Sequence, residues 1–390
     1  MYKIQTLNKI STVGLENFSR DSYEIASEIM NPDAVLVRSA DMHETQFAPT
    51  LKTIARAGAG VNNIPIEKCS EKGIVVMNTP GANANSVKEL VIAALLISSR
   101  KVVQGIAWAK TLAGKGDEVP KLIEKGKTNF EGPEIKGKRL GVIGLGAIGV
   151  KVANDAIALG MEVTGYDPII SVEAAWELSR TVKRALSLDS LLSKSDYISL
   201  HVPLNDKTKS MLNKDKFALM KKGVRILNFA RGGLVKNEDL KVAIKDGIVA
   251  AYVTDFPDDD LLAIENVIPV PHLGASTPEA EDNCAIMAVN QVRNFLEYGN
   301  IKNSVNFPDC EMDPSGKTRI LVGNRNVPNM VGQITTLLAA EKINIADMLN
   351  KSKGDLAYNI IDIDNAMSES ALAKLKAIEG TIMVRVLEKK

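Results

Sequence analysis

The sequence predicts an α/β protein in which one parallel-sheet domain is inserted into another, followed by a small α+β unit. Short apolar runs alternate with helical patterns along most of the chain, as is typical of parallel sheets covered by helices. A glycine-rich turn between a strand and a helix pattern comes late, at residues 144–149. The pattern changes to strand–helix–strand–strand–helix–strand after residue 317.

Length, composition and charge limit the class of protein. A chain of 390 residues that is 45% hydrophobic is expected to form two or three domains with full cores. Its 48 basic and 47 acidic residues give no sign of a nucleic-acid partner. The longest apolar stretch, residues 90–97, is too short to span a membrane, and the start lacks the apolar core of a signal peptide. Three cysteines without a CxxC pair argue against zinc or disulfides, so we expect a cytoplasmic protein without a metal or membrane partner.

The first hundred residues carry the pattern of an outer domain. Residues 34–37, 53–55 and 73–77 are nearly continuous apolar runs, which favour buried parallel strands. Residues 85–104 have one apolar face and predict a single long helix, and the stretch rich in lysine and glycine at 114–127 follows it. We assign residues 1–97 to the first segment of the outer domain.

The glycine-rich turn predicts a dinucleotide site. Residues 140–143 form the strand before it, residues 150–159 the helix after it, and a second strand at 161–166 ends at Asp167. The glycines allow a tight turn, close approach of the pyrophosphate and close packing of helix on strand. A carboxylate at the end of the second strand accepts hydrogen bonds from the ribose hydroxyls, which favours NAD over NADP. The predicted contacts are Gly144, Gly146, Ala147, Ile148, Gly149 and Asp167.

Further strands continue the inserted domain. They are predicted at 197–200, 225–228, 249–253 and 266–270, and their carboxyl ends should face the ligand crevice. His201 ends one of these strands, where it either borders the cofactor or packs as a neutral core residue. The helix predicted at 277–297 returns to the outer domain. We therefore assign residues 98–282 to the cofactor domain and 283–307 to the returning segment of the outer domain.

Three strand ends carry side chains suited to catalysis. Arg231 follows one strand and is suited to binding a carboxylate in a two-pronged geometry, the alternative being a structural salt bridge. His272 ends another and is a candidate general base, although a lone histidine is more often a core residue. The acidic run at 255–260 between them offers a carboxylate for the imidazole, or is a solvated turn, which we prefer for Asp258. Arginine, acid, histidine and NAD together imply hydride transfer from a 2-hydroxy acid.

The last segment has the element order of a ferredoxin-like fold. Strands are predicted at 319–322, 344–350, 357–364 and 381–387, and helices at 328–342 and 368–378. Residues 308–316 have the composition of a linker, so this domain spans 317–390. It contains no cluster of catalytic side chains.

The motifs GLGAIG, YDP, HVPL, NFARGG and PHLGAST resemble the D-isomer-specific 2-hydroxyacid dehydrogenases, over residues 1 to 305. The resemblance implies a Rossmann-type NAD domain inserted in a discontinuous flavodoxin-like substrate domain. It implies catalytic roles for Arg231 and His272. The family's glutamate corresponds to Asp260, with Asp259 as the second choice. It implies cofactor contacts at His201, Pro203, Thr208, Phe229, Ala230, Arg231, Asp255, His272 and Gly274.

Within the family, the chain most resembles members that oxidise 3-phosphoglycerate in serine biosynthesis. This implies a substrate site made by Arg38, Arg56, Ala59, Gly60, Asn78, Arg231 and His272. A hydroxypyruvate or glyoxylate reductase of the same family is the enzymatic alternative. An NAD-sensing binding protein is the alternative from another class, and it would need a peptide groove or interaction motif that the sequence does not display.

The C-terminal domain resembles an ACT domain, a small-ligand regulatory module. Asn326 and Asn344 match asparagines that bind serine in feedback-inhibited relatives. Asn324 replaces a histidine that is common in serine-binding versions, and Asn329 replaces the usual glycine. The resemblance implies serine as a regulatory ligand at Asn324, Asn326 and Asn344, with the two replacements counting against it. Paired ACT domains would make the protein a homodimer or homotetramer.

Overall fold

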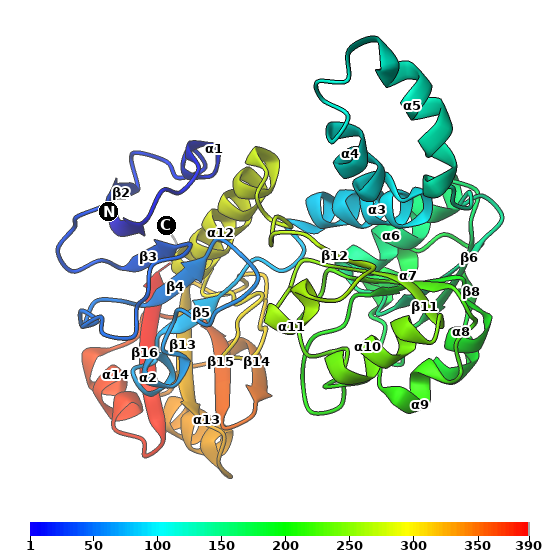
Figure 1. Ribbon diagram of the computed structural model, residues 1–390. Helices are drawn as coiled ribbons and strands as arrows, with labels where there is room; N and C mark the ends of the chain where they lie inside the picture. The colour runs from blue at the N-terminus through cyan, green and yellow to red at the C-terminus, as the bar shows by residue number, and fades with distance from the viewer. Residues whose placement is uncertain (389–390) are drawn as a thin grey trace. The chain divides into compact units, whose positions relative to one another are not determined.

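The chain divides into two compact units in the computed structural model, which describes residues 1–388 (Figure 1). Unit 1 combines residues 1–82 with the chain from 278 onward, and unit 2 comprises residues 83–277. The predicted boundaries at 97 and 282 fall inside helices α3 (Ala84–Arg100) and α12 (Pro278–Tyr298). Each helix belongs to one unit because its whole apolar face packs on one core. Residues 389 and 390 of the predicted C-terminal domain lie outside the described residues.

Unit 1 begins with a five-stranded parallel sheet in the order β2-β1-β3-β4-β5. This is the flavodoxin-like order, as the family resemblance implied. The apolar pattern does not predict β1 and β2. Strand β1 buries only Ile4 completely and so lacks a continuous apolar run. The strands are β1 (Tyr2–Leu7), β2 (Tyr23–Ala26), β3 (Ala34–Val37), β4 (Thr53–Arg56) and β5 (Val75–Met77), with helices α1 (Thr12–Leu15), α2 (Ile66–Glu71) and α12.

Unit 2 contains a seven-stranded parallel sheet in the order β12-β11-β10-β9-β6-β7-β8. The direction of chain order reverses between β6 and β9, and that switch point is where open parallel sheets bind ligands. This confirms the predicted Rossmann-type domain. Its strands are β6 (Arg139–Ile143), β7 (Glu162–Tyr166), β8 (Lys183–Arg184), β9 (Tyr197–Leu200), β10 (Val224–Asn228), β11 (Val249–Thr254) and β12 (Val267–Pro269). Its helices include α3, α6 (Ala147–Ala158), α7 (Val172–Glu177), α8 (Leu188–Lys194), α9 (Lys214–Phe217), α10 (Asn237–Lys245) and α11 (Asp259–Leu262).

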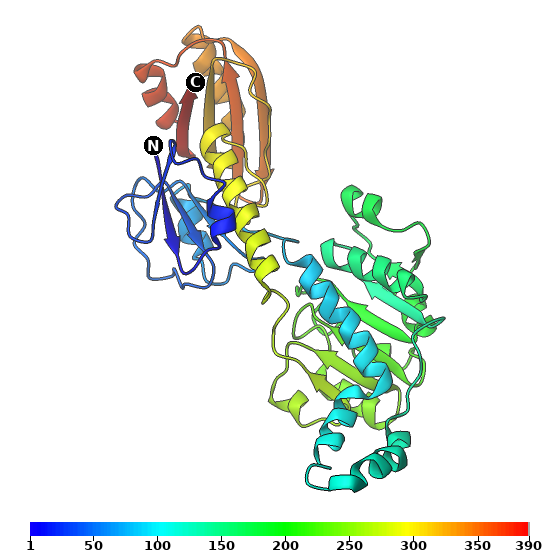
Figure 2. The ribbon, with the colours of Figure 1, turned by 90° about the horizontal axis from the view of Figure 1, so that it is seen from above.

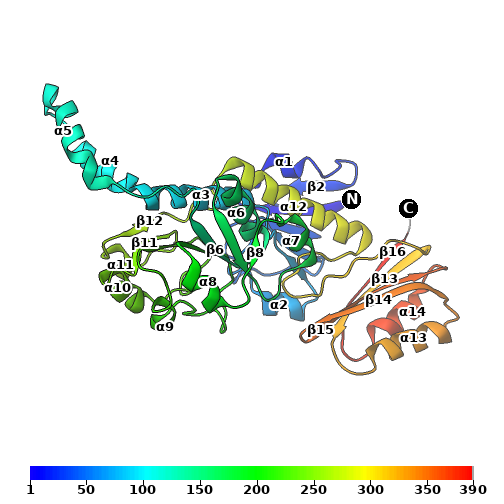
Figure 3. The same cartoon turned by 90° about the vertical axis from the view of Figure 1, so that its right-hand side faces the viewer.

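The single helix predicted over residues 85–104 is wrong. Helix α3 ends at Arg100 because Lys101 adopts a left-handed conformation with φ of 48°, and α4 (Val102–Lys110) starts again at 67° to it. The stretch rich in lysine and glycine then forms η1 (Gly116–Glu118), α5 (Val119–Gly126) and η2 (Lys127–Phe130). No residue of α4 or α5 is buried, and both project from unit 2 (Figure 3). Among the described helices none is long and apolar enough alone to cross a membrane; α3 and α4 meet that test only as a bent pair.

The C-terminal part of unit 1 is an antiparallel sheet in the order β14-β15-β13-β16. Helices α13 (Met330–Ala340) and α14 (Glu369–Lys376) cover one face of it (Figure 3), which confirms the predicted ferredoxin-like order. The strands are β13 (Thr318–Arg325), β14 (Ile345–Lys353), β15 (Leu356–Ile363) and β16 (Thr381–Glu388).

The other face of this sheet packs inside unit 1. Leu321 and Tyr358 belong to the same buried cluster as Ile4 of the parallel sheet and Phe295 of α12. Helix α12 runs beside both sheets (Figure 2). The two sheets of unit 1 therefore share one hydrophobic core.

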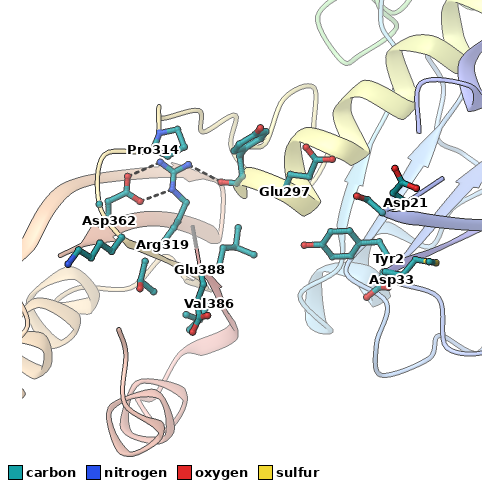
Figure 4. Close-up of a pocket in the computed structure, with 16 residues that line it drawn as sticks. Tyr2, Asp21, Asp33, Glu297, Pro314, Arg319, Asp362, Val386 and Glu388 are labelled. Atoms are coloured by element: carbon teal, nitrogen blue, oxygen red, sulfur yellow. Dashed lines mark hydrogen bonds and ion pairs between the residues drawn. The ribbon is translucent and has the colours of Figure 1, made fainter. Parts of the chain in front are cut away.

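Two arginines of the antiparallel sheet bind the end of α12. Arg319 forms a two-pronged ion pair with Asp362, at 2.7 and 2.9 Å, and its Nη1 donates to the carbonyl oxygen of Tyr298 at 2.9 Å (Figure 4). Arg385 donates to the carbonyl oxygens of Phe295 and Leu296 at 3.3 and 3.0 Å. The last carbonyl groups of a helix lack partners within the helix, so these arginines satisfy them and oppose the negative end of its dipole.

Candidate functional site

The predicted glycine turn joins β6 to α6 and leaves no room for larger residues at two positions. Gly144 has φ of +90°, and a Cβ there would lie 2.6 Å from the carbonyl oxygen of His201. A Cβ on Gly149 would lie 2.0 Å from the carbonyl oxygen of Gly144. Gly146 faces open space, and no side chain caps the start of α6. The turn therefore presents free N–H groups and an open approach, as an anion at a helix N-terminus requires.

Asp167 lies at the end of β7, the strand next to the turn. Its Oδ2 accepts a hydrogen bond from the N–H of Leu145 at 2.8 Å, and its Oδ1 accepts one from the N–H of Ile169 at 2.9 Å. These bonds fix the carboxylate beside the glycine turn and leave lone pairs on both oxygens. The geometry fits the ribose of a dinucleotide whose pyrophosphate lies at the turn.

His201 is a neutral residue beneath the turn. Burial lowers the pKa of its ring to about 3, and its Nε2 is 2.8 Å from Oγ of Ser199. Its buried Nδ1 has no hydrogen-bond partner among the described residues. A ring that is neutral at physiological pH keeps one N–H donor and one acceptor, which suits His201 for packing and hydrogen bonding. In the loop that follows, Thr208 Oγ1 donates to the carbonyl oxygen of Pro203 at 2.6 Å, which holds the loop closed.

Arg231 lies in the exposed loop after β10. Its Nη1 donates to the carbonyl oxygen of Ala230 at 2.6 Å, and no carboxylate within the described chain is paired with it. The loop is held by Asn228, a buried residue that the sequence did not mark. Its Nδ2 donates to the carbonyl oxygen of Arg231 at 2.9 Å and to the hydroxyl of Tyr252 at 3.0 Å. Its position after an apolar strand and before Ala-Arg-Gly-Gly is the only sequence signal for this role.

Asp255 is the carboxylate whose charge acts on His272 and Arg231. It is buried at the end of β11, where desolvation raises its pKa to about 6, while the charges of His272 and Arg231 act to lower it. Its Oδ1 has no hydrogen-bond partner among the described residues. The ring of Phe256 packs against His272 with centroids 4.6 Å apart. The charges of His272 and Arg231 therefore act on Asp255, although no hydrogen bond or ion pair joins these three side chains in the described chain.

The remaining acids lie on α11. Asp258 caps that helix, with Oδ1 accepting from the N–H of Leu261 at 3.0 Å, which agrees with a structural role. Asp259 and Asp260 are exposed in its first turn. Within residues 1–388 no hydrogen bond or ion pair joins either of them to His272, so the role of Asp260 stays a prediction.

The predicted substrate residues of unit 1 lie at the ends of β3 and β4. Nη1 of Arg38 forms an ion pair with Oε1 of Glu281 on α12 at 2.7 Å. Arg56 donates from Nε to the carbonyl oxygen of Arg38 at 2.9 Å, and no carboxylate in the described residues is paired with it. Burial acts to lower the pKa of Arg56, far too little to remove its charge at neutral pH. Arg56 is therefore available to an anion, whereas Arg38 already has a partner.

Backbone groups next to Arg56 are also available. The N–H groups of Ala59 and Gly60 donate to no other described residue. Asn78 donates from Nδ2 to the carbonyl oxygen of Ala59 at 2.5 Å, and so holds this loop rather than reaching beyond it. The arrangement offers one guanidinium and two amides to a small anion.

The three asparagines proposed as regulatory have separate protein partners. Asn324 is buried, donates to the carbonyl oxygen of Arg325 at 2.6 Å and accepts from Nδ2 of Asn359 at 2.8 Å. Asn326 donates to the carbonyl oxygen of Gly354 at 3.0 Å, and Asn344 donates to Oδ2 of Asp364 at 2.6 Å. Each side chain is tied within the antiparallel sheet and its loops.

A cavity of about 1040 Å³ lies elsewhere in unit 1, between the start of β1, the end of α12 and the antiparallel sheet (Figure 4). None of the predicted site residues lines it. No group of three or more histidine, cysteine, aspartate or glutamate side chains within residues 1–388 is arranged to hold a metal ion.

Comparison with known proteins identifies the family. Residues 92–274 match the model of the D-isomer specific 2-hydroxyacid dehydrogenase NAD binding domain. A D-3-phosphoglycerate dehydrogenase from Methanocaldococcus jannaschii is 34% identical over 93% of this chain and 68% of its own length. A hydroxypyruvate reductase from Thermotoga maritima is 39% identical over 73% of this chain and 90% of its own length. This chain belongs to the D-isomer-specific 2-hydroxyacid dehydrogenase family.

A solved structure agrees with this D-2-hydroxyacid dehydrogenase assignment. The NAD-bound 3-phosphoglycerate dehydrogenase of Entamoeba histolytica aligns with a TM-score of 0.61 at 26% identity, covering 78% of this chain and 98% of that one. The protein is an NAD-dependent oxidoreductase of this family. The residues present fit the cofactor, because the open approach at Gly146 and the fixed carboxylate of Asp167 suit its pyrophosphate and ribose.

Replacing Asp167 with alanine should weaken NAD binding by about tenfold, because the ribose hydroxyls lose a charged acceptor. NADP binding should weaken less, since the carboxylate repels its 2′-phosphate in the wild type. Titration of both cofactors by fluorescence checks this, with Asp167→Asn as the control that keeps one acceptor oxygen. An unchanged ratio of the two affinities would remove the role assigned to Asp167.

Proposed function

We propose that this enzyme oxidises 3-phospho-D-glycerate to 3-phosphohydroxypyruvate with NAD, the first step of phosphorylated L-serine biosynthesis. The observation that carries the proposal is the guanidinium of Arg56, half-buried and without a carboxylate partner in the described chain. A substrate with an uncharged tail has no use for such a group, whereas a phosphate does. The names of the relatives from Methanocaldococcus jannaschii and Entamoeba histolytica support the same substrate.

Each residue has a role in this reaction. Arg231 receives the substrate carboxylate in a two-pronged geometry, which its unpaired guanidinium permits. His272 takes the proton of the C2 hydroxyl, and a neighbouring carboxylate stabilises the imidazolium that results. NAD, when bound, supplies the nicotinamide ring that accepts the hydride from C2. Arg56, with the N–H groups of Ala59 and Gly60, receives the phosphate, while Arg38 stays paired with Glu281.

A panel of substrates tests the proposal. NAD reduction is assayed with 3-phosphoglycerate, glycerate, lactate and 2-hydroxyglutarate side by side, in the wild type and in Arg56→Gln. We expect 3-phosphoglycerate to have the highest kcat/KM, and Arg56→Gln to lower it for that substrate alone. A preference for glycerate, unaffected by Arg56→Gln, would instead favour a hydroxypyruvate reductase, the function named for the Thermotoga maritima relative.

Two carboxylates are candidates for the group that assists His272. The family resemblance indicates Asp260, whereas the electrostatics of the structure favour Asp255. We expect Asp255→Asn to lower kcat by about 10²-fold, as for loss of a group that supports a general base. Asp260→Asn should lower it more than Asp259→Asn, which is the matched control from the same exposed helical turn. Equal activity of the two α11 variants would remove Asp260 from the mechanism.

Regulation and assembly complete the proposal. We propose a cytoplasmic homodimer or homotetramer in which serine acts at the ACT-like domain through Asn326 and Asn344. Asn326 follows β13 and Asn344 precedes β14, at opposite ends of the sheet, and both are exposed, so each is accessible to a ligand. The substrate assay repeated with serine, and light scattering with and without it, test both statements. An enzyme that is monomeric and indifferent to serine would contradict them.

A further inference from the structure

We propose a phosphate-binding site at the amino-terminal ends of β6, β9 and β10, at the edge of the seven-stranded sheet opposite the glycine turn. A cavity of about 180 Å³ lies there. Four cations line it, Lys138, Lys221, Lys222 and Arg225, together with a single carboxylate, Asp196. The reaction proposed above uses none of these residues.

The carboxylate of Asp196 is already occupied on both oxygens. Its Oδ1 accepts from Nζ of Lys221 at 2.7 Å, and its Oδ2 accepts from the N–H of Arg139 at 2.9 Å. Burial acts to raise the pKa of Asp196, but these hydrogen bonds, with the charges of Lys221 and Lys138, outweigh it and hold the pKa below its usual range. Asp196 is therefore ionised and balances Lys221. The charge of Lys138 also acts on Asp196, whereas those of Lys222 and Arg225 are not balanced by it.

Arg225 is held in place by groups other than carboxylates. Its Nε donates to the carbonyl oxygen of Ser98 at 3.0 Å, and its Nη1 donates to that of Gly223 at 3.2 Å. The guanidinium carbon lies 5.5 Å from the centre of the Tyr197 ring. Its Nη2 has no partner among the described residues. A guanidinium fixed in this way offers its free edge to an anion at little cost in side-chain entropy.

The two remaining lysines are exposed and come from different segments. Lys138 precedes β6 and Lys222 precedes β10, and neither is paired with a carboxylate in the described chain. Four cations against one carboxylate leave an excess of positive charge at the cavity. Cations supplied both from before β6 and from the start of β10 suit a tetrahedral dianion, whose oxygens point several ways, better than a planar carboxylate. The ligand is therefore a phosphate group, either inorganic phosphate or the end of a small phosphomonoester.

The location separates this site from the cofactor. Strand β6 has five residues and runs from the cavity at its amino-terminal end to the glycine turn at its carboxyl-terminal end. The cavity and the turn therefore lie about 16 Å apart. Phosphate at the proposed site should accordingly bind together with NAD rather than compete with it. This property makes the two sites separable in an experiment.

The test measures thermal unfolding with increasing inorganic phosphate, in saturating NAD and at ionic strength kept constant with sodium chloride. We expect the midpoint of the wild type to rise by about 2–4 °C once phosphate exceeds its dissociation constant several-fold. The double variant Lys138→Gln with Lys222→Gln should lose this rise, and its phosphate affinity by calorimetry should fall about tenfold. Lys241→Gln, an exposed lysine on α10, is the matched control and should keep the rise.

The outcomes are distinct. Unchanged circular dichroism and NAD affinity will show that the double variant is folded. A rise of equal size in the double variant and in Lys241→Gln would overturn the proposal, as would an equal rise with chloride alone. Glycerol 1-phosphate serves as a second probe: a rise with both probes supports a site open to phosphomonoesters, and a rise with inorganic phosphate alone supports a site closed around the free ion.

Discussion

Arg231→Ala is expected to lower kcat/KM for the 2-hydroxy acid by about 10³-fold or more, while NAD affinity stays close to that of the wild type. The loss follows because a two-pronged contact to the carboxylate both binds the substrate and orients C2 for hydride transfer. The fold should be unaffected, since the side chain is exposed and its one hydrogen bond goes to the neighbouring carbonyl of Ala230. Steady-state kinetics and a cofactor titration on the same preparation measure both quantities.

Two further variants test whether the effect is specific to the guanidinium of Arg231. Arg231→Lys keeps the charge but loses the planar fork, so it should recover only a small part of the activity. Arg180→Ala removes another exposed arginine from unit 2 and should behave as the wild type. An equal loss of substrate turnover and NAD affinity in Arg231→Ala would refute the substrate role.

Asp362→Asn should lower the free energy of unfolding by about 3–5 kcal/mol, because it leaves Arg319 buried without its counter-charge. Both side chains are almost fully buried, with exposed fractions of 6% for Arg319 and 1% for Asp362. Urea unfolding followed by circular dichroism measures the change. Arg319→Met combined with Asp362→Leu should recover most of the loss, since it removes both charges from the interior. Equal destabilisation in the single and double variants would mean that the shape of the two side chains, and not their charge, determines the loss of stability.

The same ion pair gives stability a pH dependence with a definite sign. Burial acts to raise the pKa of Asp362, but hydrogen bonds from Arg319 and Ser315 outweigh it and hold the pKa below its usual range. A carboxyl whose folded pKa is depressed stabilises the fold above the pKa of an unfolded aspartate. That contribution is lost as pH falls through the folded pKa. The variant without both charges should therefore lose less stability in acid than the wild type.

Local patterns were sufficient to predict most of the architecture and the cofactor site. The order of strand, glycine turn, helix and acid at Gly144 and Asp167 is contained in fewer than thirty consecutive residues, about the size of one βαβ unit, so one sequence window reports it. The ferredoxin-like order after residue 317 is likewise a run of neighbouring elements. In both cases residues that are close together in the sequence are also close together in space.

Features set by distant contacts were not predictable in this way. Arg319 and Asp362 are 43 positions apart and meet only because β13 and β15 pair in one register. The role of Asn228 is not predictable from its own segment, because it depends on Tyr252 of the neighbouring strand. The influence of Asp255 on His272 arises from burial at the end of β11, which composition alone does not reveal. The break at Lys101 is a backbone conformation that the apolar pattern on either side does not report.

The core shared by the two sheets of unit 1 has a consequence for how the chain folds during synthesis. Strands β1 to β5 leave the ribosome first, yet the α12 and β13 residues that complete their core are made some two hundred residues later, which takes at least about ten seconds at ordinary rates of translation. Unit 2 is continuous and has all its partners available by residue 277. We expect the cofactor domain to fold first, with the amino-terminal strands held open until the end of the chain arrives.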